Sequence, residues 1–232
     1  MKILFFLSVC AWAQIEQPQL GIMLDRAGVA RPVWGVSASV TLGTAAATEV
    51  VSMACSRRWC IASTAAGLVS WGSGRQWSSG NRAGTAVFAF SGDSAYVYSS
   101  GQLAKWREGA SESVNVEISG EILSMRVVNG TLEFAVRRGD GTSIVRDGNA
   151  IMTALPEATG PVMLLDRAVL FATDEEVILR QPDASQIRFA AAGANSFVAM
   201  GDGYVQIRTR DSNYALRTEA GRERLFLLPE IQ

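Results

Sequence analysis

The stretch FAFSGDSAYVY, residues 88–98, decides the fold of this chain. Two short runs rich in Phe, Ala, Tyr and Val flank the polar sequence Ser91-Gly92-Asp93-Ser94. Aromatic and β-branched residues favour strands, whereas Gly, Asp and Ser favour tight turns. The stretch therefore predicts a β-hairpin with its turn at Asp93.

The same strand–turn–strand pattern recurs along the chain at a nearly constant interval. Turns are predicted at Arg57, Asp93, Asn129, Asp166 and Asp202, which lie 36, 36, 37 and 36 residues apart. Asn129-Gly130 is the strongest of these signals, because both central residues of a type I′ hairpin turn need positive φ. A fixed period of this length indicates a repeat architecture.

Each repeat contains two further predicted strands, which begin about eight and about twenty residues after the turn. Four antiparallel strands per repeat form one propeller blade. The five turns define five blades, and Leu20–Asp25, Val29–Trp34 and Val40–Leu42 match the second to fourth strands of another. We predict an all-β, six-bladed β-propeller of four-stranded blades. The innermost strand of the first blade is supplied either by Arg224–Leu228 or by Glu16–Gln19.

Residues 88–98 resemble the F-S-x-D-G…Y-V core of bacterial β-propeller repeats of the YVTN and WD40-like kind. The resemblance implies an architecture and no particular activity. A β-sandwich or barrel is the alternative fold, and it explains the strands but not their 36-residue phasing.

The N-terminal segment has the pattern of a secretory signal peptide. Lys2 precedes an apolar run over residues 3–12, and Ala11-Trp12-Ala13 fits the small-x-small cleavage site. We expect a signal peptide over 1–13, a single propeller domain over 14–232 and a periplasmic or secreted protein. A lipoprotein signal ending at Cys10 and a buried N-terminal strand are the alternatives. We expect no transmembrane helix, since the run is shorter than the roughly 20 residues that span a bilayer.

Charge and composition exclude several function classes. Lys and Arg number 21 against 22 Asp and Glu, for a net charge of −1, so the basic surface of a nucleic-acid-binding protein is not expected. The chain has no His, which excludes Ser-His-Asp and Cys-His catalysis and His-ligated metals. We expect no cofactor and no metal.

Two cysteines flank the first predicted turn. Cys55 and Cys60 are separated by four residues, which places them opposite each other on neighbouring strands and near disulfide range. An exported protein favours a disulfide here, whereas two buried thiols are the alternative.

One face of the propeller carries the candidate ligand residues. In a propeller, the loops between second and third strands share a face with the crossovers between blades. Charged residues predicted on it are Glu49, Glu121, Arg138, Asp140, Asp174, Glu175, Glu176, Arg210 and Asp211. The acids at the hairpin turns are explained by turn chemistry alone. Trp34, Trp71 and Trp106 have the spacing of inter-blade core residues.

These features favour an exported, non-enzymatic bacterial binding module for a protein, peptide or glycan. A propeller hydrolase or lyase that uses the loop carboxylates is one alternative. A structural subunit of an envelope assembly is another, which an exposed apolar patch would favour. We expect no enzyme, because no nucleophile, base or metal cage is discernible and the fold alone implies none.

Overall fold

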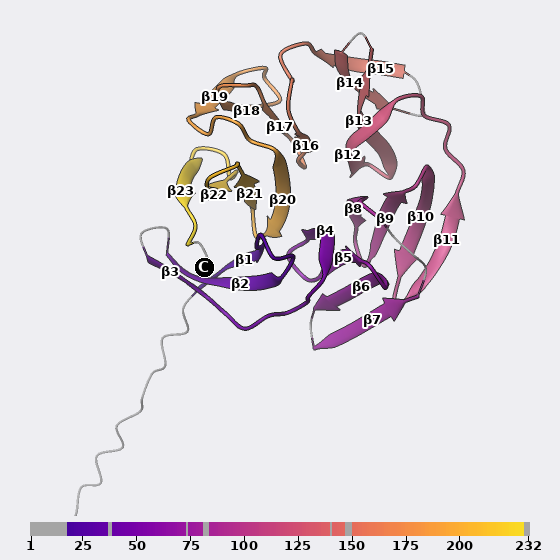
Figure 1. The fold of residues 1–232 in the computed structure, drawn as a ribbon. Coiled ribbons are helices and arrows are strands. Elements are labelled where there is room, and N and C mark those ends of the chain that lie inside the picture. The colour runs from indigo at the N-terminus through magenta and orange to yellow at the C-terminus, as the bar shows by residue number, and fades with distance from the viewer. Residues whose placement is uncertain are drawn as a thin grey trace, which may run out of the picture.

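The computed structural model describes residues 18–36, 39–72, 74–80, 84–139, 141–146 and 150–229. Their strands form six antiparallel sheets around a common centre (Figure 1). Five sheets have four strands and one has three. The chain is therefore a six-bladed β-propeller, which confirms the prediction from the 36-residue period. Among the described residues, no helix is long and apolar enough to cross a bilayer.

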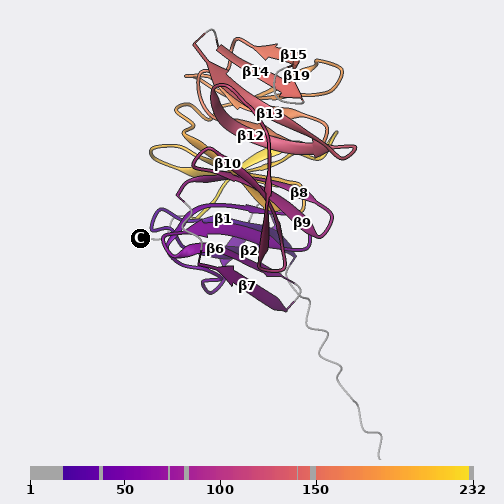
Figure 2. The ribbon, with the colours of Figure 1, turned by 90° about the vertical axis from the view of Figure 1, so that its right-hand side faces the viewer.

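The blades follow one another in chain order. The first blade is β1 (Gln19–Leu24), β2 (Ala30–Val36) and β3 (Ser39–Leu42). The second is β4 (Val50–Cys55), β5 (Cys60–Thr64), β6 (Gly67–Gly72) and β7 (Arg75–Ser79). The third is β8 (Ala86–Ser91), β9 (Ser94–Ser99), β10 (Gln102–Arg107) and β11 (Ala110–Val114). In the side view of Figure 2 the third blade lies between the second and the fourth.

The remaining three blades have the same order. The fourth is β12 (Glu121–Val128), β13 (Thr131–Arg138), β14 (Gly141–Arg146) and β15 (Ala150–Leu155). The fifth is β16 (Val162–Leu164), β17 (Val169–Ala172), β18 (Val177–Arg180) and β19 (Gln186–Phe189). The sixth is β20 (Ser196–Gly201), β21 (Tyr204–Arg208), β22 (Asn213–Arg217) and β23 (Arg224–Leu227).

The five predicted turns occupy equivalent places, between the first and second strands of blades two to six. Neighbouring blades also touch near these turns. Arg58 pairs with Asp93 of the next turn, and Arg126, on β12 just before its turn, donates to the carbonyl of Leu165 in the next one. We call this side, with the turns between third and fourth strands, the hairpin face. The opposite side, with the loops between second and third strands and the inter-blade crossovers, is the loop face.

The C-terminal candidate segment does not supply the innermost strand of the first blade. Residues Arg224–Leu227 form β23, which pairs with β22 as the outer strand of the sixth blade. Gln19 belongs to β1 and pairs with Trp34, while residues 16–17 lie outside the described part. The prediction that residues 224–228 complete the first blade is therefore wrong. This segment pairs instead with the free edge of β22 in the sixth blade.

A side chain takes over the role of a strand at the inner edge of β1. The Leu24 N–H donates to Oε1 of Gln206, and Nε2 of Gln206 donates to the Leu24 carbonyl, both at 2.8 Å. Gln206 lies on β21, is fully buried and also donates to Asn213 Oδ1 at 3.1 Å. A carboxamide carries both a donor and an acceptor, so it pairs with the backbone as a peptide unit would. The first and sixth blades are joined through this contact.

The hydrophobic core is divided among the blade boundaries. One cluster of buried apolar side chains fills each of the six boundaries of the ring, for example Leu170 with Ile207 between blades five and six. A fully buried side chain of this size contributes about 1.5–3 kcal/mol. Two serines of the inner strands also link blades: Ser52 accepts from the Ala86 N–H, and Ser124 from that of Leu164. Side-chain packing therefore positions each blade against the next.

Candidate binding cleft

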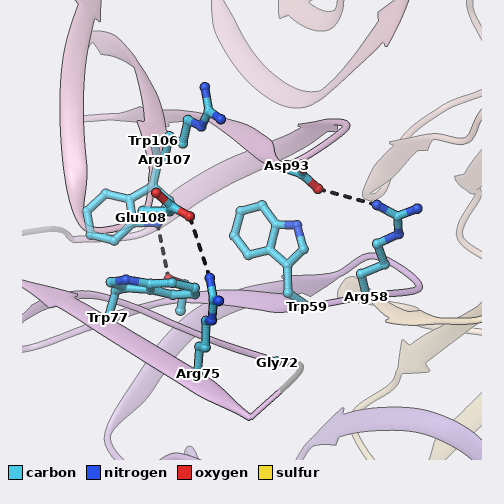
Figure 3. Close-up of a pocket in the computed structure, with 10 residues that line it drawn as sticks. Arg58, Trp59, Gly72, Arg75, Trp77, Asp93, Trp106, Arg107 and Glu108 are labelled. Carbon is cyan, nitrogen blue, oxygen red and sulfur yellow. Dashed lines mark hydrogen bonds and ion pairs between the residues drawn. The ribbon is translucent and has the colours of Figure 1, made fainter.

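A cleft opens on the hairpin face at the boundary between the second and third blades (Figure 3). Its volume of about 370 Å³ lies within the range of small-molecule sites. Turns from both blades form it. The residues that line it are Arg58, Trp59, Ser70, Gly72, Arg75, Trp77, Asp93, Trp106, Arg107 and Glu108.

Three tryptophans form the apolar walls of the cleft. Trp106 of β10 is only 1% exposed, and its indole N–H donates to Ser70 Oγ at 3.2 Å. Trp59 and Trp77 are partly exposed. Figure 3 shows Trp59 on one side of the space and Trp77 with Trp106 on the other. Trp106 therefore anchors the wall in the core, while Trp59 and Trp77 offer ring surface to a ligand.

Two ion pairs bridge the cleft from blade to blade. Arg58 Nη1 lies 3.4 Å from Asp93 Oδ1, and Arg75 Nη1 lies 4.0 Å from Glu108 Oε1. In each pair the arginine belongs to the second blade and the acid to the third. All four side chains are between 59% and 77% exposed. Exposed pairs contribute at most about 1 kcal/mol, so these two add little to the stability of the fold.

The disulfide holds the turn that carries one wall of the cleft. Cys55 and Cys60 are directly paired in the register of β4 and β5 and form a disulfide, as predicted, with Cα atoms 4.0 Å apart. Within the turn, Ser56 Oγ accepts from the N–H groups of Arg58 and Trp59, each at 3.2 Å. The turn is thus fixed at both ends, and Arg58 and Trp59 are presented from a rigid hairpin.

One hydrogen-bond donor in the wall has no partner. The indole nitrogen of Trp59 is buried and makes no hydrogen bond within the described residues. The Trp59 ring packs edge-on against Phe90, with centroids 5.0 Å apart and planes at 89°. An unsatisfied buried donor costs about 1–3 kcal/mol. The indole N–H of Trp59 is therefore a source of local instability in the cleft wall.

The eight predicted ligand residues that the structure describes lie on the loop face and are spread over several blades. Asp174 accepts a hydrogen bond from Thr159 at 3.0 Å, and Arg138 donates to the Ser119 carbonyl at 2.9 Å. Glu176 forms an ion pair with Arg188. Glu49 lines a second hollow, beside Thr64, at the crossover into the second blade. The other predicted residues belong to blades four to six, namely Glu121, Glu175, Arg210 and Asp211, and Asp140 lies outside the described residues.

Sequence reasoning missed the residues that form the cleft. Trp106 was predicted as inter-blade core, and its burial confirms this. Trp59 and Trp77 were not singled out, although each stands next to a turn on the hairpin face. Their position beside these turns could have pointed to them, but the sequence does not show which aromatic side chains remain partly exposed.

The cleft combines apolar and charged side chains. It combines flat apolar rings with charged groups that neutralise one another across its mouth. Within the part of the chain that the structure describes, no group of three or more acids or cysteines could hold a metal ion. The cleft can therefore stack a ring and hydrogen-bond its polar edge.

Comparisons with known proteins show the fold and nothing finer. No family model and no curated protein matches the chain. Among solved structures, PorZ, a bacterial surface component of the type-IX secretion system of Porphyromonas gingivalis, matches with a TM-score of 0.56 and 12% identity. The match covers 91% of this chain but only 31% of PorZ, so the chain spans about a third of that protein.

Two further structures match over most of both chains. A chain of the nidogen/laminin complex matches with a TM-score of 0.59 and 10% identity, over 90% of this chain and 93% of that one. A streptogramin B lyase matches with a TM-score of 0.51 and 10% identity, over 93% and 85%. Identities this low establish a shared propeller architecture only.

Proposed function

We propose that this propeller is an exported, non-enzymatic binding module whose ligand site is the cleft between the second and third blades. The observation that carries the proposal is the pair of partly exposed tryptophans, Trp59 and Trp77, which the second blade presents at its boundary with the third. Sites of this kind are preformed, largely apolar and supplied with a few polar groups that orient the ligand.

Export is supported by two features of the chain. The Cys55–Cys60 disulfide persists in oxidising compartments such as the periplasm or the medium. The first thirteen residues have the pattern of a cleaved signal. N-terminal sequencing of the exported protein is expected to begin at Gln14, whereas retention of Met1 in that fraction would contradict the proposal.

Two of the solved relatives support a binding role outside the cytoplasm. PorZ is a surface component of a secretion system, and the nidogen/laminin chain takes part in a protein complex. Streptogramin B lyase shows that a similar ring also serves an enzyme. Of the predicted loop-face acids Asp140, Asp174 and Glu175, on which an enzymatic alternative would depend first, Asp174 is engaged with Thr159. We therefore favour a binding function over a catalytic one.

The alternative of a structural subunit depends on exposed apolar surface. The outer strand β15 exposes Ile151 and Met152 and carries no charged residue. Two such residues form a small patch, and scattered exposed apolar side chains are normal on monomers. The cleft is the more developed surface feature.

The proposal is tested by a binding screen on the exported chain and two variants. Tryptophan fluorescence is titrated with soluble oligosaccharides and short peptides for wild type, Trp77→Ala and Trp34→Ala. Trp34 is also partly buried but lies in the first blade, so it is a matched control. We expect a saturable ligand that Trp77→Ala loses and Trp34→Ala keeps. A ligand held equally by Trp77→Ala and wild type would place the site elsewhere.

A further inference from the structure

We infer that the cleft binds a neutral, hydroxyl-rich saccharide, with a sugar ring against the indole surfaces of Trp59 and Trp77. The inference rests on the proposed binding function and adds the class of ligand. It follows from three properties of the cleft: its aromatic walls, the two bridges at its mouth and the match of each bridge arginine by a carboxylate.

The aromatic walls match the shape of a pyranose. A sugar ring has flat C–H surfaces that are apolar, and an equatorial edge of hydroxyl groups. A tryptophan offers a large, rigid apolar face at small cost in side-chain entropy. Trp77 extends from β7 and Trp59 from the disulfide-bonded turn, so neither ring depends on a mobile loop.

The bridges match the hydroxyl edge. A hydroxyl group both donates and accepts, a guanidinium only donates and a carboxylate only accepts. Arg58 with Asp93, and Arg75 with Glu108, each place a donor and an acceptor side by side. Neighbouring hydroxyls can therefore be bound by one pair, and such charge-assisted hydrogen bonds are the strong ones.

The balance of charge favours a neutral ligand over an anion. The two arginines of the bridges are matched by two carboxylates at the same mouth. Arg107 also lines the site, but Figure 3 shows its guanidinium directed away from the three rings. A phosphate or uronate would have to displace Asp93 or Glu108 and then lie beside that carboxylate.

The bridges also disfavour an extended peptide. In the view of Figure 3 the Arg75–Glu108 pair lies between Trp59 and the rings of Trp77 and Trp106, and the Arg58–Asp93 pair lies on the far side of Trp59, so a bridge interrupts the surface on either side of that ring. An extended chain recognised by its backbone needs a continuous groove or a free strand edge. A compact ring fits a bounded space better.

The test compares three classes of probe on the full exported chain. Calorimetric titrations use neutral trisaccharides of glucose, galactose and N-acetylglucosamine, a trimer of galacturonate, and a library of hexapeptides. We expect at least one neutral trisaccharide to bind, Trp77→Ala to weaken it about tenfold and Trp77→Phe to keep most of the affinity. Trp34→Ala should leave it unchanged.

A second variant keeps the test valid if Trp77→Ala fails to fold. Arg75→Gln changes an exposed side chain, and we expect it to preserve the melting temperature and to weaken the neutral trisaccharide about threefold or more. If only galacturonate or peptides bind, and Trp77→Ala or Arg75→Gln weakens them, the saccharide class is overturned while the binding function stands. If no probe is sensitive to either variant, both proposals are overturned.

Discussion

Two blade boundaries of this propeller use arginines and acids in opposite ways. Between the fourth and fifth blades, Arg126 of β12 donates to the carbonyls of Leu165 and Ala168, at 2.7 and 3.3 Å. Its guanidinium also pairs with Glu133, which is 2% exposed and forms a second pair with Arg146. This network lies among the strands and seals the boundary.

Between the second and third blades, the corresponding charges lie at the ends of the strands. Arg58 lies within the turn between β4 and β5, whereas Arg126 lies on β12, before the equivalent turn. A shift of a few residues about the same hairpin moves the guanidinium from the inter-strand space to the solvent-exposed tip. The comparison teaches that the position of a charge relative to the turn decides whether a boundary is sealed or left open as a cleft.

The largest effect is expected when the sealed boundary loses its buried carboxylate. Glu133→Gln removes the charge that compensates Arg126 and Arg146, and breaking a buried pair leaves uncompensated charges. We expect the free energy of unfolding to fall by about 3 kcal/mol. Urea denaturation measures it, and a loss no larger than that of Glu108→Gln would remove the distinction between the two boundaries.

A smaller effect is expected from the disulfide behind the open boundary. The bridge closes a short loop, with a sequence separation of 5. Replacing both Cys55 and Cys60 by Ser should therefore lower the free energy of unfolding by about 2 kcal/mol. Urea denaturation is compared for wild type with and without reductant and for the double variant. If reductant destabilised the double variant as much as wild type, the loss of stability would not come from this disulfide.

The two boundaries should also differ in their response to acid. Burial by itself raises the pKa of Glu133, but the hydrogen bonds and charges of Arg146 and Arg126 outweigh it and hold the pKa below the ordinary value of 4.5. The stabilisation is thus complete above that value and is lost as pH falls through the lower pKa of the folded state. The difference in Tm between wild type and Glu133→Gln should narrow below pH 4.5. A constant difference between pH 7 and about 3 would show that the carboxylate charge is not responsible.

The smallest effect on stability is expected at the open boundary. Asp93→Asn and Glu108→Gln each break one exposed pair, and such pairs contribute about 0–1 kcal/mol. We expect each variant to change the free energy of unfolding by less than about 0.5 kcal/mol. A fall in the free energy of unfolding close to that of Glu133→Gln would mean that the two ion pairs of the cleft stabilise the fold.

The repeat made the ring predictable from the sequence. The turns at Arg57, Asp93, Asn129, Asp166 and Asp202 recur with a nearly constant period, and strand chemistry repeats around each one. The sequence also predicted that residues 20–42 provide only three strands of the first blade, with the innermost strand supplied from elsewhere. The contact of Gln206 at the inner edge of β1 was not predicted, because it joins residues 182 positions apart and depends on a single buried side chain.

The cleft was beyond prediction for a different reason. Its residues come from four turns of two blades, and each of them has an ordinary explanation as turn or core chemistry. Asp93 lies in the turn between β8 and β9 as expected, yet it also faces Arg58 across the boundary. Whether two neighbouring turns meet or stay apart depends on packing between blades, which periodicity does not specify.

The most direct test of the central claim is a footprint of the bound ligand on the backbone. Amide hydrogen exchange of the exported chain is measured with and without the tightest-binding probe of the screen. We expect slower exchange in peptides that cover the cleft turns, residues 56–60, 72–77 and 106–109, and no change at 126–133. Protection confined to the loop-face segments 173–176 and 209–212, with the cleft turns unaffected, would contradict the account.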